Sequence, residues 1–364
     1  MTTVMPATAA SSPADEDSPY DLFVLAIKAK ATRKKYVANL KTFMDGRSMF
    51  SEVADFEERC RQVVSKARAD PSWLDRAFRD YCIESRDRLE RKQLRPGSIW
   101  NIISAIRLFF AVNDFDVLKW KKCTRGIPFG RKAADDVVPS REQIVKMAGY
   151  PDRRVKVLAY CMASGGWRVG AWEYLKWGHF TPICRDLDRD GEEELVACRV
   201  LIYAGEDEQY YTLITPEAYV VTKDWIDLRE RSGETINRDS WVMRDLWNDR
   251  VRKGGNHQGA KIEAPKRLSL QGIETQLNRA WLTQGVRARL EGERRRHAFS
   301  QAHVFRKYFK TTAEGAGMKS INVETLMGHS IGVSDSYYRP REDDLLQDYL
   351  QAIPALTFES HREY

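Results

Sequence analysis

The sequence has no apolar run long enough to cross a lipid bilayer, and its mean hydropathy is -0.54. Its first residues lack the basic start and the apolar stretch of a secretory signal. Its six cysteines are scattered, without a CxxC pair or a Cys/His grouping at metal spacing. These absences argue against a membrane protein, a disulfide-stapled secreted domain and a zinc site. They predict a cytoplasmic protein with reduced thiols and with no metal or other cofactor.

Positive charge is in only slight excess, with 59 Lys and Arg against 52 Asp and Glu, a net charge of +7 and a pI near 9.0. This balance suits a nucleic-acid partner but is common among proteins that bind none. The basic residues cluster at 28–41, 119–132 and 287–310, where a solvated helix face and a DNA contact are both open interpretations. As candidate DNA contacts we take Lys34, Lys35, Lys121, Lys122, Arg125, Arg131 and Lys132.

The first third of the chain has the pattern of a helical domain. Residues 1–19 are small, acidic and proline-containing, which predicts a disordered tail. Residues 20–120 carry apolar side chains at spacings of three and four, interrupted by Pro96 and Gly97. Residues 121–137 are rich in Lys and Arg, contain Gly and Pro, and lack periodicity, which predicts an extended basic linker.

Residues 138–364 have the pattern of a second domain of mixed structure. Ser140 and Gln143 have the spacing of a capping box before a helix, and Gly165 with Gly166 separates a buried helix from a second one that begins near Trp167. Two β-rich runs between 194 and 215 flank the turn AGEDEQ and predict a hairpin. A polar stretch at 222–265 predicts an insertion, and DDLLQDYLQAI predicts a short amphipathic helix at the end of the chain. The fold class predicted is mainly α (α+β), with a small β-hairpin.

A tyrosine, a histidine and two arginines together suggest phosphoryl transfer. A tyrosine phenol has a pKa of about 10, so a nucleophilic tyrosine needs cations or a base beside it. Histidine transfers protons near neutral pH, and two arginines can bind the nonbridging oxygens of one phosphate. An arginine, a histidine and a tyrosine lie between Arg306 and Tyr338. Arg168, at a predicted helix start, supplies the second arginine. Such a set attaches DNA to protein without a metal ion.

The order of these residues is specific. GGWRVGAWEYLKW, then HVFR, then LMGH, then a tyrosine nine positions after that histidine, resembles the phage-integrase type of tyrosine recombinase, possibly its archaeal branch. The resemblance implies a catalytic set, with Tyr337 as the second choice of nucleophile: Arg168, His303, Arg306, His329 and Tyr338.

The resemblance also implies the architecture and the reaction. The expected fold is a helical, SAM-like core-binding domain at 20–120 and a catalytic domain from 138 with the tyrosine-recombinase fold, together forming a C-shaped clamp around double-stranded DNA. Tyr338 is expected to form a 3′-phosphotyrosyl link at a specific site while the arginines hold the phosphate. The protein is expected in the nucleoid as a tetramer on DNA, and its last helix either packs on its own domain or docks on a neighbouring protomer.

Two departures from the family pattern are visible. The family carries a lysine in the hairpin turn that protonates the leaving 5′-oxygen, but no lysine occurs between Lys176 and Lys223. Arg199, Lys261 and Lys266 are weak substitutes, and the general acid is unassigned. The acidic residue expected three positions after Arg168 is replaced by Ala171, and Glu173 lies on a different side of a helix.

Other interpretations remain open. Arg168 could be a surface ion-pair residue, His303 and Arg306 a solvated face, and the tyrosine pair a packing contact. Two rival functions share the same residues: a type IB-like DNA topoisomerase, and a DNA-binding protein whose catalytic site has decayed.

Overall fold

The computed structural model describes residues 18–129, 137–186, 192–247, 262–289, 297–332, 337–338 and 340–359. The chain forms two compact units, Met1–Ala134 and Asp135–Tyr364. The candidate residues Arg131, Lys132 and Lys261, and the N-terminal tail up to residue 17, lie outside the described residues. Among the helices within the described ranges, none combines the length and the apolar character needed to span a membrane.

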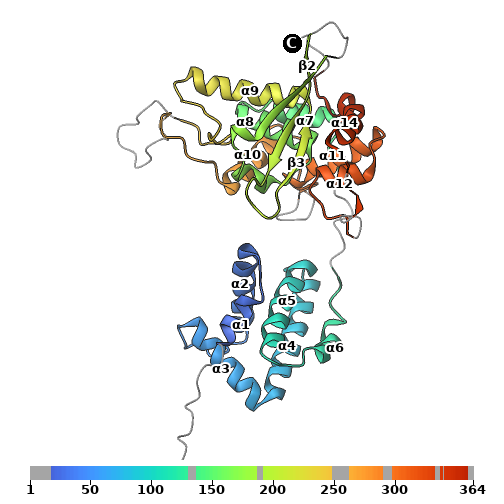
Figure 1. Cartoon of the computed structure of the whole chain (residues 1–364). Coiled ribbons are helices and arrows are strands. Elements are labelled where there is room, and N and C mark those ends of the chain that lie inside the picture. The colour runs from blue at the N-terminus through green and yellow to red at the C-terminus, as the bar shows by residue number, and fades with distance from the viewer. Residues whose placement is uncertain are drawn as a thin grey trace, which may run out of the picture. The chain divides into compact units, whose positions relative to one another are not determined.

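The first unit is a set of helices around an aromatic and aliphatic core (Figure 1). A proline begins α1, α4 and α5, where a missing N–H costs nothing, and the carboxylates of Asp55 and Asp70 cap α3 and α4. The elements are α1 (Pro19–Leu25), α2 (Lys30–Gly46), α3 (Phe56–Ala69), α4 (Pro71–Glu90), α5 (Pro96–Val112), η1 (Leu118–Trp120) and α6 (Lys121–Thr124).

The described part of the predicted linker at 121–137 differs from the expectation, because residues 121–129 pack onto the first unit. The buried Trp120 ring stacks on Phe78 with ring centroids 4.2 Å apart and draws the following residues inward. Lys121–Thr124 form α6, and Phe129 stacks on Trp100 with ring centroids 4.7 Å apart. The aromatic contacts of Trp120 and Phe129 therefore hold the segment on the first unit, although its polar composition is typical of an extended linker.

The second unit is built around α8, whose residues are buried on every side from Val157 to Gly165. It contacts α7, α9, α10, α11, α14 and β3, and Figure 1 shows it behind the sheet. The predicted capping box of Ser140 and Gln143 is confirmed at the start of α7. The helices are α7 (Arg141–Ala148), α8 (Arg153–Gly165), α9 (Pro216–Arg231), α10 (Leu270–Thr283), α11 (His303–Gly315), α12 (Ser320–Leu326) and α14 (Glu342–Leu356), with short turns η2 (Val169–Glu173) and η3 (Trp177–His179).

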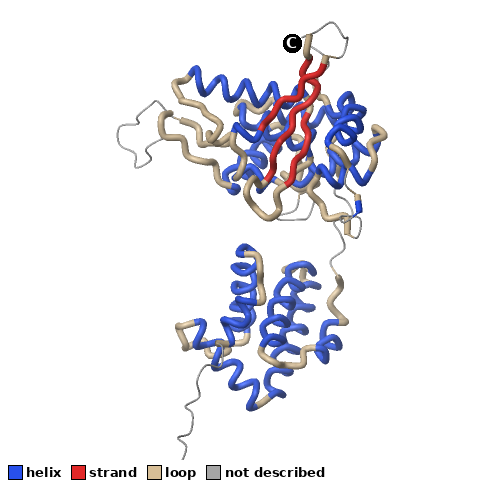
Figure 2. The backbone as a smooth tube through the Cα atoms, in the orientation of Figure 1, coloured by secondary structure: helices blue, strands red, loops and turns tan. Residues whose placement is uncertain are grey.

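The sheet has three antiparallel strands in the order β1 (Phe180–Arg185), β2 (Glu194–Ile202) and β3 (Tyr210–Ile214), as Figure 2 shows. The hairpin of β2 and β3 confirms the prediction, with Cys198 opposite Ile214 and Ile202 opposite Tyr210. β1 was not predicted. The described part of the chain is thus mainly helical with one small sheet, as the sequence indicates.

Two polar or turn-rich segments have a structure that the sequence did not indicate. The segment after Trp167 is the 3₁₀ turn η2 rather than a helix, because Trp167 and Trp172 are both buried and hold the chain in a tight turn. The polar stretch at 222–265 is folded into the second unit where it is described, because α9 continues to Arg231 and the next residues return to the core.

The polar side chains of that stretch form a buried ionic cluster. Glu234 accepts hydrogen bonds from Arg229 at 3.0 and 2.6 Å and from Arg244 at 2.8 Å, and all three side chains are almost fully buried. The two guanidinium groups hold the pKa of the Glu234 carboxyl below its usual value, although burial alone raises it. Residues that resemble a solvated loop in sequence are therefore part of the interior.

The last helix packs on its own unit. Leu345, Leu346 and Tyr349 of α14 are buried, and the helix contacts α8 and α11. The apolar side of α14 is therefore covered within the chain itself.

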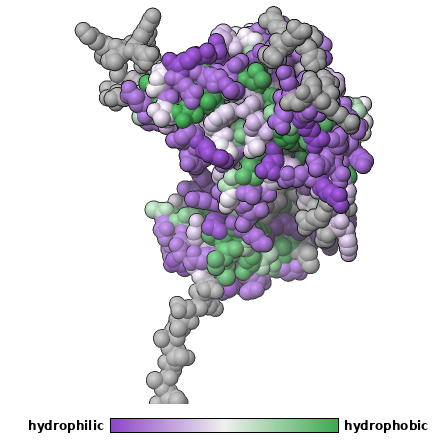
Figure 3. Space-filling model, turned by 45° about the horizontal axis from the view of Figure 1, so that its top comes forward, coloured by the Kyte–Doolittle hydropathy of each residue, from purple (hydrophilic) through white to green (hydrophobic). Residues whose placement is uncertain are grey.

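The face of the molecule seen in Figure 3 is mostly hydrophilic, with smaller hydrophobic patches.

Candidate functional site

The centre of the candidate site is Arg306, a buried arginine on α11. One guanidinium nitrogen donates to the Gly166 carbonyl at 2.6 Å, and the other donates to the Met327 carbonyl at 3.2 Å and to Nε2 of His329. Burial lowers the pKa of Arg306, and the nearby charge of Arg168 lowers it further. The side chain is thus fixed by two segments far apart in sequence.

Arg168 lies two residues after Gly166 and precedes η2, with its side chain exposed. Gly166 ends α8 in the left-handed conformation, with φ of +68°, and a Cβ atom there would lie 2.3 Å from the Phe309 ring of α11. Only glycine fits such a close approach at this backbone angle. The turn therefore brings the start of η2 against α11. The positive charges of both arginines lower the pKa of the same two phenols, Tyr203 and Tyr210.

Three consecutive carbonyls at the end of α8 accept hydrogen bonds from side chains of three other elements. The Ser164 carbonyl accepts from Tyr349 of α14 at 2.9 Å, and the Gly165 carbonyl accepts from Thr212 of β3 at 2.8 Å. The Gly166 carbonyl accepts from Arg306. A helix C-terminus leaves such carbonyls without helical partners and carries partial negative charge, so it stabilises the guanidinium of Arg306.

His329 approaches Arg306 from the turn after α12. Gly328 has φ of +63°, and a Cβ atom there would lie 2.4 Å from the Tyr210 ring. Because a guanidinium group can only donate, Nε2 of His329 accepts its hydrogen bond and the ring proton sits on Nδ1. Nδ1 then donates to the carboxylate of Glu324.

Glu324 continues this chain of contacts to a lysine. Its other carboxylate oxygen pairs with Lys310, which also pairs with Glu314 at 2.9 Å. Burial raises the pKa of Glu324, but the hydrogen bonds from Lys310 and His329 outweigh it and leave that pKa below its usual value. Glu324 was not singled out from the sequence, although its place five residues before His329 in one short helical segment was a usable signal.

The hairpin contributes two tyrosines that the sequence analysis did not assign. Burial raises the pKa of Tyr210 to about 12, and its hydroxyl is buried beside Arg306 without a well-formed hydrogen bond to any described residue. Tyr203 follows β2 with φ of +53°, and its ring lies against Tyr174 with centroids 5.3 Å apart. A positive φ at an aromatic residue costs roughly 1–3 kcal/mol and concentrates at functional sites. The signal in the sequence was the pair of tyrosine positions on either side of the AGEDEQ turn.

His303 is the first residue of α11 and is exposed, with its backbone N–H donating to the Ser300 hydroxyl at 3.3 Å. It precedes Arg306 by three residues, so the two side chains lie on neighbouring positions of one helix face. The helix therefore places the exposed His303 about one turn before the buried arginine.

Tyr338 is held apart from the arginines. Its hydroxyl donates to the side-chain oxygen of Asn322, and the Asn322 amide donates to Asp348 of α14 at 2.7 Å. Tyr338 lines a cavity together with Asn322, Asp348 and Tyr337, and Tyr337 is 84% exposed. Of the five predicted residues, the structure brings together Arg168, Arg306 and His329, sets His303 on the same helix as Arg306, and directs Tyr338 to a different partner.

Within the described residues, the two substitutes for the missing lysine, Arg199 and Lys266, make other contacts. Arg199 pairs with Glu342 of α14 at 3.0 Å, on the face of the sheet that also carries Tyr211. Lys266 is exposed, and its carbonyl accepts from Asp245 at 2.9 Å. Glu173 supports the neighbouring segment by accepting from the Leu270 N–H at 3.2 Å.

The candidate DNA contacts of the first unit are all at its surface where they are described. Lys34 and Lys35 lie exposed on α2, Lys121 and Lys122 lie exposed on α6, and Arg125 is exposed just after it. Their exposure leaves their charge available to a phosphate backbone.

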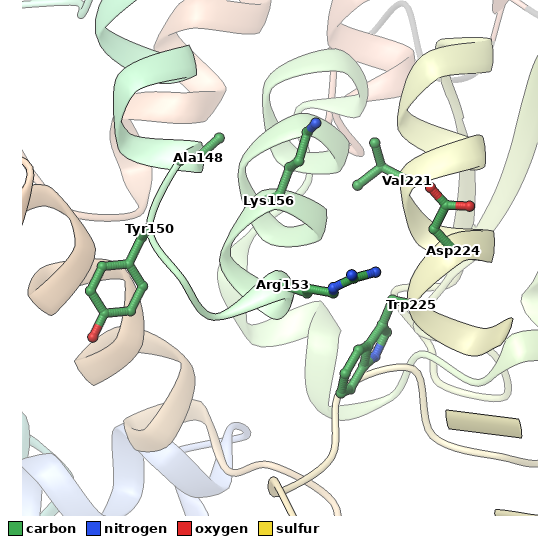
Figure 4. Close-up of a pocket in the computed structure, with 8 residues that line it drawn as sticks. Ala148, Tyr150, Arg153, Lys156, Val221, Asp224 and Trp225 are labelled. Carbon is green, nitrogen blue, oxygen red and sulfur yellow. The ribbon is translucent and has the colours of Figure 1, made fainter. Parts of the chain in front are cut away.

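A second cavity, of about 270 Å³, lies at the other end of α8 (Figure 4). Arg153 and Lys156 from α8 face Val221, Asp224 and Trp225 from α9, while Tyr150 points away from them. Lys156 is paired with Glu359 at 2.7 Å. Because α8 rises about 1.5 Å per residue, Arg153 lies roughly 20 Å from the arginine cluster, and the cavity is separate from the candidate site.

A scan of protein-family models finds no match to the chain, and a search of curated protein sequences finds none either. Among solved structures, the chain is similar to XerA recombinase, with 17% identity over 92% of this chain and 97% of that chain and a TM-score of 0.36. It is also similar to the XerH site-specific recombinase in a post-cleavage complex with palindromic difH substrate, with 14% identity over 92% and 96% of the two chains and a TM-score of 0.46. The Tn1549 transposon integrase in complex with transposon right end DNA matches with 11% identity over 90% and 97% of the chains and a TM-score of 0.42. With identities this low, the residues of the site itself carry the functional assignment.

Proposed function

We propose that this chain is a site-specific DNA recombinase of the tyrosine type, which cleaves and rejoins strands through a 3′-phosphotyrosyl intermediate. The observation that carries the proposal is the meeting of Arg306 with the segment of Arg168, through a hydrogen bond of 2.6 Å to a carbonyl 140 residues away in the chain. A buried guanidinium and a second, exposed guanidinium form a cradle of hydrogen-bond donors for a phosphate anion, and a histidine lies beside the buried one.

In the proposed reaction, Arg168 and Arg306 hold the nonbridging oxygens of the scissile phosphate and neutralise the charge that grows in the transition state. In the free chain, three of the five N–H donors of Arg306 are used by two carbonyls and His329, which leaves two for the phosphate until the phosphate takes the place of His329. Arg168, which is exposed, supplies the rest.

Tyr338 acts as the nucleophile after its hydroxyl leaves Asn322. Its oxygen attacks phosphorus as its proton passes to His303, and the 5′-oxygen of the next nucleotide departs. Nε2 of His329 donates to a nonbridging oxygen once it carries a proton and the phosphate replaces it as the acceptor for Arg306. The phosphodiester energy is kept in the tyrosyl ester, so a 5′-hydroxyl from a partner duplex completes strand exchange without ATP.

The DNA partner is bound by both units. The exposed basic residues of α2 and α6 contact the phosphate backbone of a double-stranded site, and four copies of the chain assemble on two such sites. In the free chain the apolar side of α14 is packed on its own unit, so a neighbouring copy can take up that side only if this packing is exchanged.

The test is covalent capture of DNA. The purified chain is incubated with a pool of nicked duplexes that carry a randomised core, and complexes that survive SDS are recovered, sequenced and mapped by peptide mass spectrometry. We expect an adduct on Tyr338. Tyr338→Phe should abolish it while filter retention of DNA without SDS stays unchanged, and the exposed neighbour variant Tyr337→Phe should retain it.

The outcomes separate the alternatives. An adduct on Tyr337 would contradict the assignment of the nucleophile. Relaxation of supercoiled plasmid without exchange between two copies of the captured sequence would favour a topoisomerase. Absence of any adduct with the unchanged chain, with DNA retention intact, would favour a decayed DNA-binding protein.

A further inference from the structure

Strand cleavage leaves one proton unaccounted for in the candidate site. The departing 5′-oxygen is an alkoxide, a strong base, and needs a proton as its bond to phosphorus breaks. The hairpin of β2 and β3 has no lysine to supply it, since none occurs between Lys176 and Lys223. The need for this proton donor rests on the proposed function, because only a strand-cleaving site has a 5′-oxygen to protonate.

Tyr203 occupies the start of the hairpin turn and reaches the turn that carries Arg168. A Cβ atom on Gly170 would lie 3.6 Å from the Tyr203 hydroxyl. Gly170 belongs to η2, two residues after Arg168. The phenol therefore crosses from the sheet to the segment of the exposed arginine.

The surroundings of Tyr203 keep its hydroxyl protonated and available. Burial raises the pKa of this phenol, Arg168 and Arg306 lower it, and Tyr174 and Glu208 raise it. No hydrogen bond ties the hydroxyl to another residue within the described ranges. It is thus a neutral donor close to both guanidinium groups.

We propose that Tyr203 is the general acid of this site and gives its phenolic proton to the leaving 5′-oxygen. The bond between the Tyr338 oxygen and phosphorus forms as the bond between phosphorus and the 5′-oxygen breaks. The electron pair of the broken bond stays on the 5′-oxygen, which takes the proton from Tyr203. The Tyr203 phenolate left behind lies beside Arg168 and Arg306, and it recovers a proton from water or, when the strand is rejoined, from the attacking 5′-hydroxyl.

Tyr210 is the other phenol of the hairpin, and its position gives it a different task. Its ring lies under Gly328, and its buried hydroxyl lies beside the guanidinium of Arg306. It therefore sets the position of Arg306 and of the turn that carries His329. This makes Tyr210→Phe a matched control, because it removes one phenolic hydroxyl from the same hairpin.

The experiment compares two leaving groups. Suicide duplexes with the captured sequence are made with either a normal phosphodiester or a 5′-bridging sulfur at the scissile bond, and single-turnover adduct formation is measured for the unchanged chain, Tyr203→Phe and Tyr210→Phe. A thiolate leaves without a proton, so a missing general acid matters only for oxygen. We expect Tyr203→Phe to slow cleavage by about 10²- to 10⁴-fold with oxygen and to match the unchanged chain with sulfur.

Several other outcomes would overturn the general-acid role of Tyr203. Slowing of Tyr203→Phe that is equal for both leaving groups, or no slowing with oxygen, removes the role. Rescue by sulfur in Tyr210→Phe but not in Tyr203→Phe transfers the role to Tyr210 and overturns the proposal. If the unchanged chain forms no adduct with either duplex, both the proposed function and this inference are wrong. If Tyr203→Phe cleaves normally, only this inference is wrong. DNA retention equal to that of the unchanged chain verifies that Tyr203→Phe is folded.

Discussion

The guanidinium of Arg306 donates a hydrogen bond to Nε2 of His329, and this contact assigns the ring proton of His329 to Nδ1. The same proton is donated to Glu324, whose second oxygen is paired with Lys310. The proton on Nδ1 of His329 is therefore held by the carboxylate of Glu324, which lies outside the cluster of arginines. Glu324 is thus a positioning residue for His329.

Glu324→Gln should slow adduct formation by about 10-fold, because an amide keeps the shape but loses the charge that orients the ring, and hydrogen bonds to charged groups contribute about 1.5–3 kcal/mol. The measurement is single-turnover cleavage by Glu324→Gln, with Glu314→Gln as the matched control, since Glu314 also pairs with Lys310 but does not touch His329. Equal slowing in the two variants would point to Lys310 instead of the histidine.

The same carboxylate gives a pH dependence of stability. The pKa of Glu324 is lower in the folded chain than its ordinary 4.5, so its contribution is fully present above that value and is lost as pH falls through the lowered folded pKa. The difference in free energy of unfolding between the unchanged chain and Glu324→Gln should thus shrink on acidification below 4.5. Its size should be about 1 kcal/mol or less, because the group is partly exposed. Denaturant titrations at several pH values measure it, and a difference that grows on acidification would contradict the sign.

Asn322 holds Tyr338 in the free chain. Asn322→Ala removes the acceptor for the Tyr338 hydroxyl and should raise the single-turnover rate of adduct formation by about 2- to 10-fold, since a hydrogen bond of this kind contributes roughly 0.5–1.5 kcal/mol. Asp348→Asn serves as the control, because it disturbs the partner of Asn322 but leaves the acceptor for the tyrosine in place. A slower reaction of Asn322→Ala would mean that Asn322 contributes to the transition state.

Arg168→Ala should reduce adduct formation by about 10²- to 10³-fold, the range found when one donor to a developing oxyanion is removed. Because Arg168 is exposed, the variant should remain folded. Arg153→Ala, an exposed arginine at the far end of α8, is the control and should cleave normally. Similar losses in both variants would indicate a general effect of charge and not a phosphate contact.

The buried ionic cluster predicts a large effect on stability. Glu234→Gln should lower the free energy of unfolding by about 3–5 kcal/mol, because it leaves the buried guanidinium groups of Arg229 and Arg244 without a counter-charge. The exposed Glu230→Gln, four residues earlier, should change it by less than about 0.5 kcal/mol. Chemical denaturation monitored by tryptophan fluorescence gives both values, and a small loss in Glu234→Gln would show that the cluster is open to water.

DNA affinity should fall steeply as salt concentration rises, because contacts between basic side chains and phosphates release counterions. Replacing Lys34 or Lys121 by alanine should each lower the slope of log affinity against log salt by about 1 and weaken binding to all sequences alike. Lys223→Ala is the control, because Lys223 is paired with Asp227 at 2.7 Å. An unchanged slope for the first two variants would remove them from the DNA-binding surface.

Local signals predicted the elements around the site well. The capping box at Ser140, the hairpin between 194 and 215 and the final amphipathic helix are each set by nearby residues, and all three are confirmed. β1 was not predicted because its sequence, FTPICR, contains a proline, which is uncommon inside strands. The segment forms a strand by pairing with β2, in a register that shifts between Ile183 and Cys184.

Long-range contacts explain what the sequence could not predict. The motif spacing selected Arg168, Arg306 and His329, but the partners of these residues come from elements that no local pattern connects. Glu234 was placed in a polar loop because its two arginines are close only in the folded chain. The hydroxyl of Tyr338 was expected beside the arginines, whereas its partner is Asn322 on α12. The assignment of catalytic roles to these residues stays a prediction.

The three carbonyls at the end of α8 also fix the length of that helix. Each of them faces a side chain from a separate element, so inserting or deleting a single residue within α8 would rotate all three by about 100° and misalign the last helix, the hairpin and Arg306 together. We therefore expect chains that diverge from this one to keep the number of residues between Arg153 and Arg168 unchanged.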